Sequence, residues 1–358
     1  MASKNFQAKG AFKNVDQDVL FDHYGAAARG SGIFGLSCTR AESKIVLLPV
    51  PWEATVSYGG GAAEGPSAIL RASTQVDLYD HELGLFYKQG IVMLPESGDV
   101  RVWGVEARKH AEKILAKGGV DDANRKDAQA VNERCEKLNA YVYEETKKTL
   151  AEGKIPGLVG GDHSTPLGAI KACAEKHGEI GVLHIDAHCD LRASFEDFTY
   201  SHGSIMRNVV TEMPQVKKLV QVGIRDYCRE EEEFIAGSGG RVEAFFDEDI
   251  AATLFEGGTW KAVCEDIVGK LPSDVYLSLD VDGLDPSLCP HTGTPVPGGL
   301  TFNQMQYLLK VIARSGRRII GFDLVEVAPG AEGEWDANVG ASLLFILCGW
   351  ALKSQEKK

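Results

Sequence analysis

Six short runs rich in apolar and β-branched residues recur along the chain, and stretches with helical spacing separate them. The runs are 45–51, 156–160, 180–186, 218–224, 274–282 and 318–327, and the helical stretches lie near 104–117, 124–152, 164–176, 229–237, 258–270, 301–315 and 338–353. Strands that alternate with helices connect through right-handed crossovers and form a parallel sheet with helices on both faces. The sequence therefore predicts an α/β fold with three α/β/α layers and a mostly parallel sheet, whose core positions should be apolar throughout.

Length and composition fit one large domain. The 358 residues are 44% hydrophobic and 25% charged, which is the balance of an ordinary globular protein. A single α/β core can grow to about 250–300 residues before it splits, and the chain shows no repeat, low-complexity tract or linker. We expect one domain over 43–358, preceded by an N-terminal arm over 1–42.

The charge and the cysteines limit the partners and the compartment. A net charge of −13 argues against nucleic acid, which needs a concentrated basic face, and it fits either a cationic substrate or plain solubility. The eight cysteines are scattered without a CxxC pair. The first residues lack the apolar stretch of a signal peptide, and no run is long enough to cross a bilayer. These features predict a cytoplasmic protein with reduced thiols and no membrane contact.

Unusual polar residues follow three of the predicted strands. They form the segments 160-GGDH-163, 186-DAHCD-190 and 280-DVD-282. In open α/β sheets, ligands bind outside the carboxyl ends of the strands. Segments that are distant in sequence would therefore meet at one edge of the sheet.

The two-residue spacing within these segments predicts convergence of their side chains. Alternate residues of an extended segment face the same side. The set contains four carboxylates and two imidazoles: His163, Asp186, His188, Asp190, Asp280 and Asp282. Any one of these aspartates alone would usually be a helix cap or a turn residue, and one histidine alone could belong to the core. Three such segments together favour a metal site.

The charges in this set call for two divalent cations. Four carboxylates crowded at a sheet edge repel one another and lose hydration unless cations neutralise them. Oxygen and imidazole ligands without thiolate favour Mn(II), with Zn(II), Co(II), Ni(II) or Fe(II) as alternatives. Two ions about 3.5–4 Å apart can share a hydroxide, which is a strong nucleophile. The expected chemistry is hydrolysis at an unreactive planar carbon.

Three blocks resemble the signature blocks of the ureohydrolase family, which includes arginase, agmatinase, guanidinobutyrase and formimidoylglutamase. They are 160-GGDHS-164, 184-HIDAHCD-190 and 278-SLDVDGLDPSLCPHTGTPVPGGLT-301, and the resemblance runs from about 45 to 350. It implies an arginase/deacetylase-like fold and two Mn(II) ions per subunit. It also implies a small cationic guanidino substrate that yields urea, and an assembly of three or six copies.

The resemblance implies a role for each matching residue. One ion would be bound by His163, Asp186, Asp190 and Asp280, and the other by Asp186, His188, Asp280 and Asp282, so that Asp186 and Asp280 bridge the pair. Outside this set, Asp162, His184 and Asp285 would orient ligands through hydrogen bonds.

Two further residues match the family's substrate-handling groups. His202 in 199-TYSHGS-204 corresponds to the histidine that passes a proton to the leaving amine, a task suited to its ordinary pKa. Glu326 in 323-DLVEVAP-329 corresponds to the glutamate that binds the substrate guanidinium, whose planar fork a carboxylate can grip at two points. Both residues are therefore expected at the site.

The substrate is expected to be agmatine, cleaved to putrescine and urea. The segment 190–209 looks most like the agmatinase group. Arginases read the substrate α-carboxylate through a Ser-Gly-Asn-Leu stretch, which 198-FTYS-201 replaces here, and 195-FED-197 adds aromatic surface and negative charge. The turn within 58–73, with Gly65 as a cap and Pro66 opening a helix, looks closer to arginase, so arginine remains the alternative. Guanidinobutyrase and formimidoylglutamase activities also remain open.

Two other classes fit less well. Deacetylase-like enzymes use one zinc ion and a His-His pair, which is absent here. A non-enzymatic relative would usually have lost a metal ligand, whereas all six are present.

Overall fold

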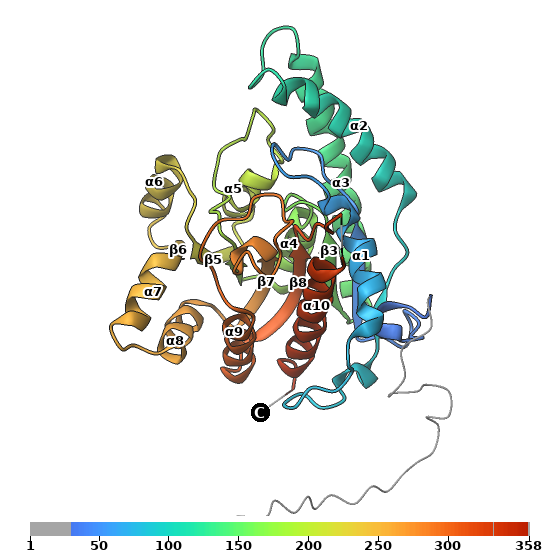
Figure 1. Ribbon diagram of the computed structural model, residues 1–358, viewed down its shortest axis with the longest axis vertical. Coiled ribbons are helices and arrows are strands. Elements are labelled where there is room, and N and C mark those ends of the chain that lie inside the picture. The colour runs from blue at the N-terminus through green and yellow to red at the C-terminus, as the bar shows by residue number, and fades with distance from the viewer. Residues whose placement is uncertain (1–29, 332, 357–358) are drawn as a thin grey trace, which may run out of the picture.

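The described part of the chain, residues 30–331 and 333–356 of the computed structural model, alternates between strands and helices (Figure 1). Residues 1–29 of the predicted N-terminal arm lie outside it. Within this part, eight strands form one sheet in the order β2-β1-β3-β8-β7-β4-β5-β6, and every neighbouring pair is parallel. The strands are β1 Ile45–Val50, β2 Ile91–Met93, β3 Ile155–Gly160, β4 Ile180–Ile185, β5 Val216–Ile224, β6 Val242–Phe246, β7 Asp274–Asp280 and β8 Arg318–Val325.

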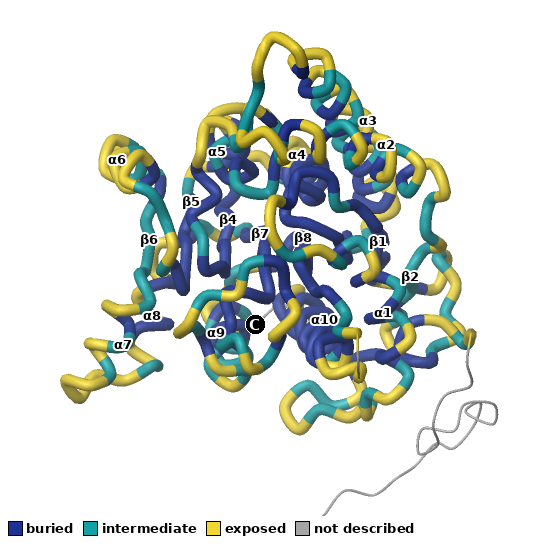
Figure 2. Tube along the Cα trace, turned by 45° about the horizontal axis from the view of Figure 1, so that its top comes forward, coloured by how far each residue is buried: buried dark blue, intermediate teal, exposed yellow. Residues whose placement is uncertain are grey.

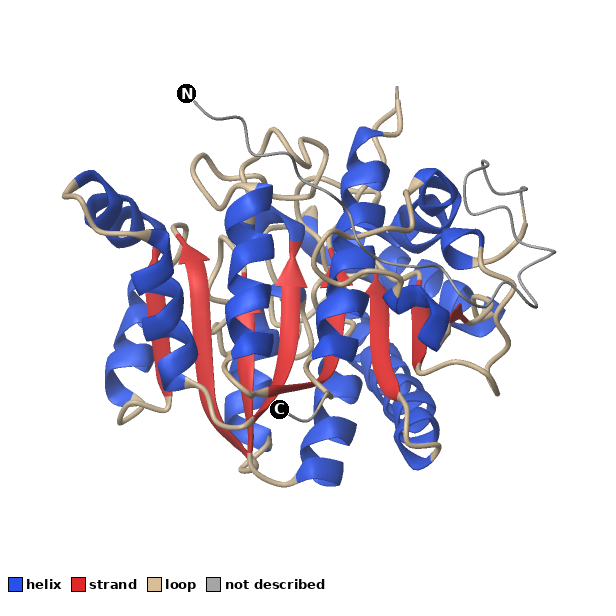
Figure 3. Cartoon of the chain, turned by 90° about the horizontal axis from the view of Figure 1, so that it is seen from below, coloured by secondary structure: helices blue, strands red, loops and turns tan. Residues whose placement is uncertain are grey.

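Helices cover both faces of this sheet (Figure 3). Buried side chains of α1, α7, α8, α9 and α10 belong to the core on one face, and those of α2, α3, α4 and α5 to the core on the other. The helices are α1 Gly65–Ala72, α2 Gly98–Leu115, α3 Arg125–Ala151, α4 Leu167–His177, α5 Ile205–Glu212, α6 Arg229–Gly237, α7 Asp247–Phe255, α8 Trp260–Lys270, α9 Phe302–Arg314 and α10 Trp335–Lys353. The predicted three-layer α/β/α fold with a parallel sheet is confirmed.

Strand residues are buried on both faces because both carry helices (Figure 2). In β4, Leu183 and Ile185 pack into the first core, whereas Val182 packs into the second. Continuous apolar runs are therefore the expected sequence of such strands.

The longest apolar helix, α10, lies in the centre of one layer. The expectation that no run is long enough to cross a bilayer is wrong by length and composition for this helix, but 83% of that stretch is buried inside the protein. Its contacts with α1, α9 and β8 show what it packs against. It is a core helix.

The strand order creates the crevice that positions the site. β3 and β4 follow each other in the chain, but β8 and β7 lie between them in the sheet. The chain leaves β4 toward β5 but leaves the neighbouring β7 toward β8, in opposite directions across the sheet. Ligand sites in such sheets lie in the crevice outside the carboxyl ends of the strands at this point.

Several short elements were not predicted. β2 has three residues and β6 has five, so neither carries enough residues to show a period. Helices α5 and α7 have eight and nine residues. The predicted start of α1 was off by one residue, because Glu64 is the N-cap and Gly65 is the first helical residue. All eight cysteines lie in the described part and are free, as expected.

Candidate metal centre

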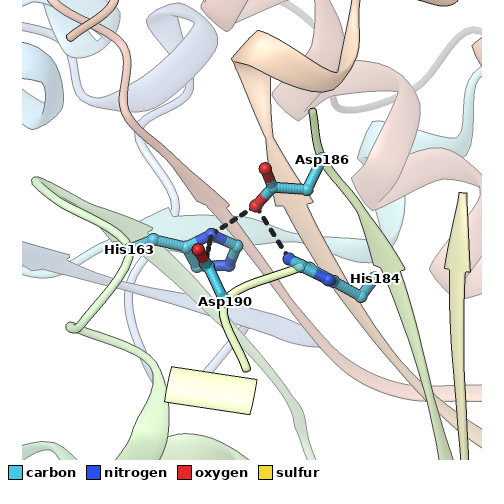
Figure 4. A group of neighbouring side chains, drawn as sticks. All are labelled: His163, His184, Asp186 and Asp190. Carbon is cyan, nitrogen blue, oxygen red and sulfur yellow. Dashed lines mark hydrogen bonds and ion pairs between the residues drawn. The ribbon is translucent and has the colours of Figure 1, made fainter. Parts of the chain in front are cut away.

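The predicted ligands lie at the carboxyl ends of β3, β4 and β7. Figure 4 shows three of them, His163, Asp186 and Asp190, together with His184. Five of the six side chains are almost fully buried, and His188 retains 24% of its side-chain exposure. The six are His163, Asp186, His188, Asp190, Asp280 and Asp282. The predicted convergence is therefore present, although the ligand roles themselves stay predictions.

His163 lies at the centre of the first group. Its Nδ1 atom is 2.9 Å from Oδ2 of Asp186, 3.2 Å from Oδ2 of Asp190 and 3.2 Å from Oδ2 of Asp280. The same nitrogen is buried and has no hydrogen-bond partner within the described residues. A ring nitrogen surrounded by three carboxylate oxygens is the donor set that a divalent cation requires.

His188 organises a second group beside the first. Its Nδ1 atom is 3.0 Å from Oδ2 of Asp282 and 3.3 Å from Oδ1 of Asp186. Asp186 thus offers one oxygen to each group, which is the geometry of a bridging ligand. Asp280 directs Oδ2 toward His163, while its Oδ1 accepts the backbone N–H of Asp282 at 2.8 Å.

The physical basis predicted for this convergence is wrong in detail. β4 ends at Ile185, and the chain then bends at Ala187 and forms an isolated parallel bridge between His188 and Asp226. The backbone N–H of His188 donates to Oδ1 of Asp186 at 2.6 Å, and Asp190 has φ 54°, in the left-handed region. A bend and a left-handed residue, rather than an uninterrupted strand, bring the three side chains to one side. Such strained backbone is common at functional sites.

Electrostatics in the metal-free chain show the need for cations. Burial, and next the charge of Asp186, raises the pKa of Asp190 to about 6. Burial, and then the charges of Asp282 and Asp186, raises the pKa of Asp280 well above its usual range. Burial alone would lower the pKa of His188, but Asp282 and Asp186 raise it to about 12. Two divalent ions in place of these protons would balance the four carboxylates, so the residues fit the implied pair of ions.

His202 lies at the edge of the site, where a proton-transfer group is needed. Its Nδ1 atom is 3.1 Å from the hydroxyl oxygen of the fully buried Thr55, so Nε2 is the nitrogen left for proton transfer. The ring of Phe195 approaches it edge-on, with centroids 5.3 Å apart. Burial, and next the positive charges of His188 and His163, lowers the pKa of His202 to about 4. The expectation of an ordinary pKa for this residue is therefore wrong in the metal-free chain, where the ring is neutral near pH 7.

Glu326 lies just beyond β8, beside the first group. Its φ is 62°, and its backbone N–H donates to the carbonyl of Gly161 at 2.8 Å. Its Oε1 accepts the backbone N–H of His163 at 2.8 Å. Burial, and then the charge of Asp280, raises its pKa well above the usual range. A buried carboxylate with one oxygen still available is suited to binding a cation.

The three residues expected to orient ligands behave differently from one another. His184 contacts a predicted ligand, with Nε2 at 2.8 Å from Oδ2 of Asp186. Asp162 binds backbone N–H groups of Ala54 and Ser164, and so fixes two loops around the site. For Asp285 the expectation is wrong, because its carboxylate accepts the backbone N–H of Ser287 and, among the described residues, makes no hydrogen bond to a predicted ligand.

Other residues at the site were not predicted from the sequence. Gln221, Ser278 and Asp323 are fully buried in strands that were expected to be apolar throughout. Their polar side chains within apolar runs were the available signal. Arg225 follows β5, and its guanidinium donates to the carbonyls of Asp282, Leu284 and Val296 at 2.6, 3.2 and 3.0 Å. It therefore braces the loop that carries Asp282.

Comparison with known proteins assigns the family. The sequence model of the arginase family matches residues 43–349. The chain belongs to the arginase family. It is 34% identical to an N(1)-aminopropylagmatine ureohydrolase of Thermus thermophilus, over 85% of this chain and 88% of the relative. It is 29% identical to an agmatinase of Bacillus anthracis, over 86% and 92%. The solved structure of the agmatine ureohydrolase of Thermoplasma volcanium has the same fold, with a TM-score of 0.66 and 24% identity over 87% and 91% of the two chains.

The arginase family comprises dinuclear metal hydrolases that cleave guanidino C–N bonds. The ureohydrolase resemblance found in the sequence is therefore confirmed. The buried His and Asp groups described above are where this chain could bind the metal.

Proposed function

We propose that this protein hydrolyses a guanidino amine without an α-carboxylate, agmatine in the first place, to the free amine and urea. The observation that carries the proposal is Asp186, whose two oxygens face the two ligand groups. A pair of Mn(II) ions bound there would activate water for attack on the guanidino carbon. A trimer or hexamer remains the expected assembly.

The chain's own residues supply binding and proton transfer. Oε1 of Glu326 accepts the backbone N–H of His163, so Oε2 remains available. Glu326 would hold the guanidinium through charge-assisted hydrogen bonds. Nε2 of His202 would take up the proton that the attacking water loses and pass it to the leaving amine, since Thr55 engages Nδ1.

The loop before His202 disfavours a substrate carboxylate. Phe198 is fully buried in the core, and the hydroxyl of Ser201 lies 2.9 Å from that of Ser204 in a capping box, so neither offers a donor. Glu196 and Asp197 form the tip of a two-residue turn, at φ 52° and 62°. A carboxylate at the tip of this turn would meet the negative charges of Glu196 and Asp197. The cation that these contacts place beside the turn is Arg192, whose guanidinium carbon lies 5.4 Å from the centre of the Phe195 ring.

A second candidate substrate is the N(1)-aminopropyl derivative of agmatine. The support is the activity in the name of the Thermus thermophilus relative, which is 34% identical to this chain. Both compounds carry a guanidino group, so Glu326 would bind both alike, and the extra amine adds a separate positive charge elsewhere in the molecule.

The test compares urea release from agmatine, N(1)-aminopropylagmatine and arginine by one Mn(II)-loaded preparation. An unpartnered charge costs several kcal/mol, and each 1.4 kcal/mol is about tenfold, so kcat/KM should favour agmatine over arginine by roughly 100-fold or more. The matched variant Asp197→Asn should narrow this ratio without loss of metal. Equal or better turnover of arginine would make the protein an arginase and overturn the proposal.

A further inference from the structure

A row of buried polar side chains crosses the sheet one level below the predicted ligands. Strand register makes direct neighbours of Gln221 on β5, His184 on β4, Ser278 on β7 and Asp323 on β8. All four are 0% exposed. Burying polar groups costs free energy unless each is hydrogen-bonded, so the partners of these four explain why they are there.

Hydrogen bonds at the Asp323 end of this polar row run in one direction. The backbone N–H of Leu279 donates to Oδ1 of Asp323 at 3.3 Å, so this oxygen is an acceptor. The hydroxyl of Ser278 lies 3.0 Å from the same oxygen and donates its single proton to it. Ser278 must then accept from Nε2 of His163, which is 2.9 Å away. Nε2 of His163 therefore carries a hydrogen, and Nδ1 is the ring atom that faces the carboxylate-lined position.

Donors and acceptors at the Gln221 end of the row can be assigned in the same way. The side-chain amide of Gln221 donates to the carbonyl of Cys189 at 2.6 Å and lies 2.9 Å from Nδ1 of His184. Since an amide nitrogen only donates, Nδ1 of His184 accepts. Its Nε2 carries the hydrogen and donates to Oδ2 of Asp186 at 2.8 Å. His184 is thus a donor to Asp186 and not itself a ligand, although it lies within reach of the first group.

We propose that the polar row of Gln221, His184, Ser278 and Asp323 positions the metal ligands. One end turns Nδ1 of His163 toward the carboxylate-lined position, where a metal would displace its proton, and the other orients the carboxylate of Asp186. A metal binds only deprotonated ligand atoms, and outer hydrogen-bond partners of ligands contribute about 10–100-fold in metal affinity. The inference concerns metal binding and is independent of which guanidino compound is hydrolysed.

A residue next to the polar row provides a control variant that changes packing without changing the hydrogen bonds of the row. Leu158 on β3 is the register partner of Asp323 on the far side, so it continues the row with an apolar side chain. It is 2% exposed and packs in the second core. Leu158→Ala should lower the melting temperature by creating a cavity. It should leave metal affinity unchanged, because Leu158 makes no hydrogen bond to the row.

The experiment titrates metal-free protein with Mn(II) by calorimetry, with circular dichroism to establish folding. Ser278→Ala leaves Nε2 of His163 without a partner, and we expect it to bind Mn(II) about 10–100-fold more weakly. Ser278→Thr restores a hydroxyl and should bind close to the wild-type value. Leu158→Ala should also bind like wild type despite its lower stability.

A second variant keeps the test decisive if Ser278→Ala does not fold. Gln221→Leu removes the amide that donates to Nδ1 of His184 at the opposite end of the row. The hydrogen of His184 is then no longer held on Nε2, where it donates to Asp186, and Mn(II) binding should weaken. If Ser278→Ala or Gln221→Leu folds and binds Mn(II) with wild-type affinity, the proposal is overturned. Equal weakening by Leu158→Ala would overturn it as well, since packing alone would then explain the effect. Because no substrate is present, failure here is distinct from failure of the proposed hydrolysis.

Discussion

Replacing Asp190 by Asn should stabilise the protein without metal and destabilise it with metal. In the metal-free chain, burial and the charge of Asp186 raise the pKa of Asp190 from 3.8 to about 6. The folded state then binds the Asp190 proton more tightly than the unfolded state does. As pH rises from about 4 to about 6, the unfolded state releases this proton first, and stability falls.

The size of the effect follows from these values. A pKa change from 3.8 to about 6 corresponds to about 3 kcal/mol, of which about 2 kcal/mol is lost between pH 4.5 and pH 7. For 358 residues, an unfolding entropy of about 2.1 cal/mol/K per residue gives about 0.75 kcal/mol/K in total. The melting temperature of metal-free Asp190→Asn, relative to metal-free wild type, should therefore rise by about 3 °C from pH 4.5 to pH 7.

The assay is scanning calorimetry of both proteins after exhaustive chelation, and again with Mn(II). Taking the difference between the two proteins at each pH cancels the titrating groups that do not interact with Asp190, which leaves Asp190 and its partners Asp186 and His163. With Mn(II) present, the sign should reverse, because ions that bind only the folded state stabilise it and an asparagine side chain at this position is a poorer ligand than the aspartate. A constant difference across this pH range would refute the electrostatic reasoning. Stabilisation of Asp190→Asn in the presence of Mn(II) would remove Asp190 from the ligand set.

Two further predictions separate metal binding from proton transfer. Asp280→Ala should cost both metal occupancy, measured by elemental analysis, and nearly all turnover, whereas His202→Ala should keep both ions and slow kcat by roughly 10²–10⁴-fold; equal metal loss in the two variants would show that His202 is misassigned. Thr55→Val removes the hydroxyl 3.1 Å from Nδ1 of His202, and it should lower kcat with little change in KM or in metal content, so a variant with unchanged kcat would rule out a positioning role for Thr55.

The sequence was sufficient for the fold because both faces of the sheet are covered. Continuous apolar strands and amphipathic helices left a readable pattern in long elements such as β5 and α9. β2 and β6 were missed because a strand of three or five residues carries little period of its own. The positions of β2 and β6 in the sheet depend on their pairing with neighbouring strands, and a local sequence pattern does not encode this pairing.

The sequence predicted which residues form the site, but not the hydrogen bonds that hold them in position. His163 and Asp186 stand at strand ends in recognisable blocks, and they do meet. The link from His163 through Ser278 to Asp323 depends on the register between β7 and β8, and this register follows from packing over the whole sheet. The left-handed backbone at Asp190 was likewise hidden, since an aspartate at φ 54° is uncommon.

The strand order also constrains how the protein can be made. β3 and β4 leave the ribosome long before β7 and β8, yet the later strands insert between them. Until roughly the last quarter of the chain is synthesised, the facing edges of β3 and β4 lack their partners, and such edges invite aggregation. Asp280 and Asp282 also arrive only with β7. Mn(II) binding should thus be a late event in folding, and it reports that the central strands are in place.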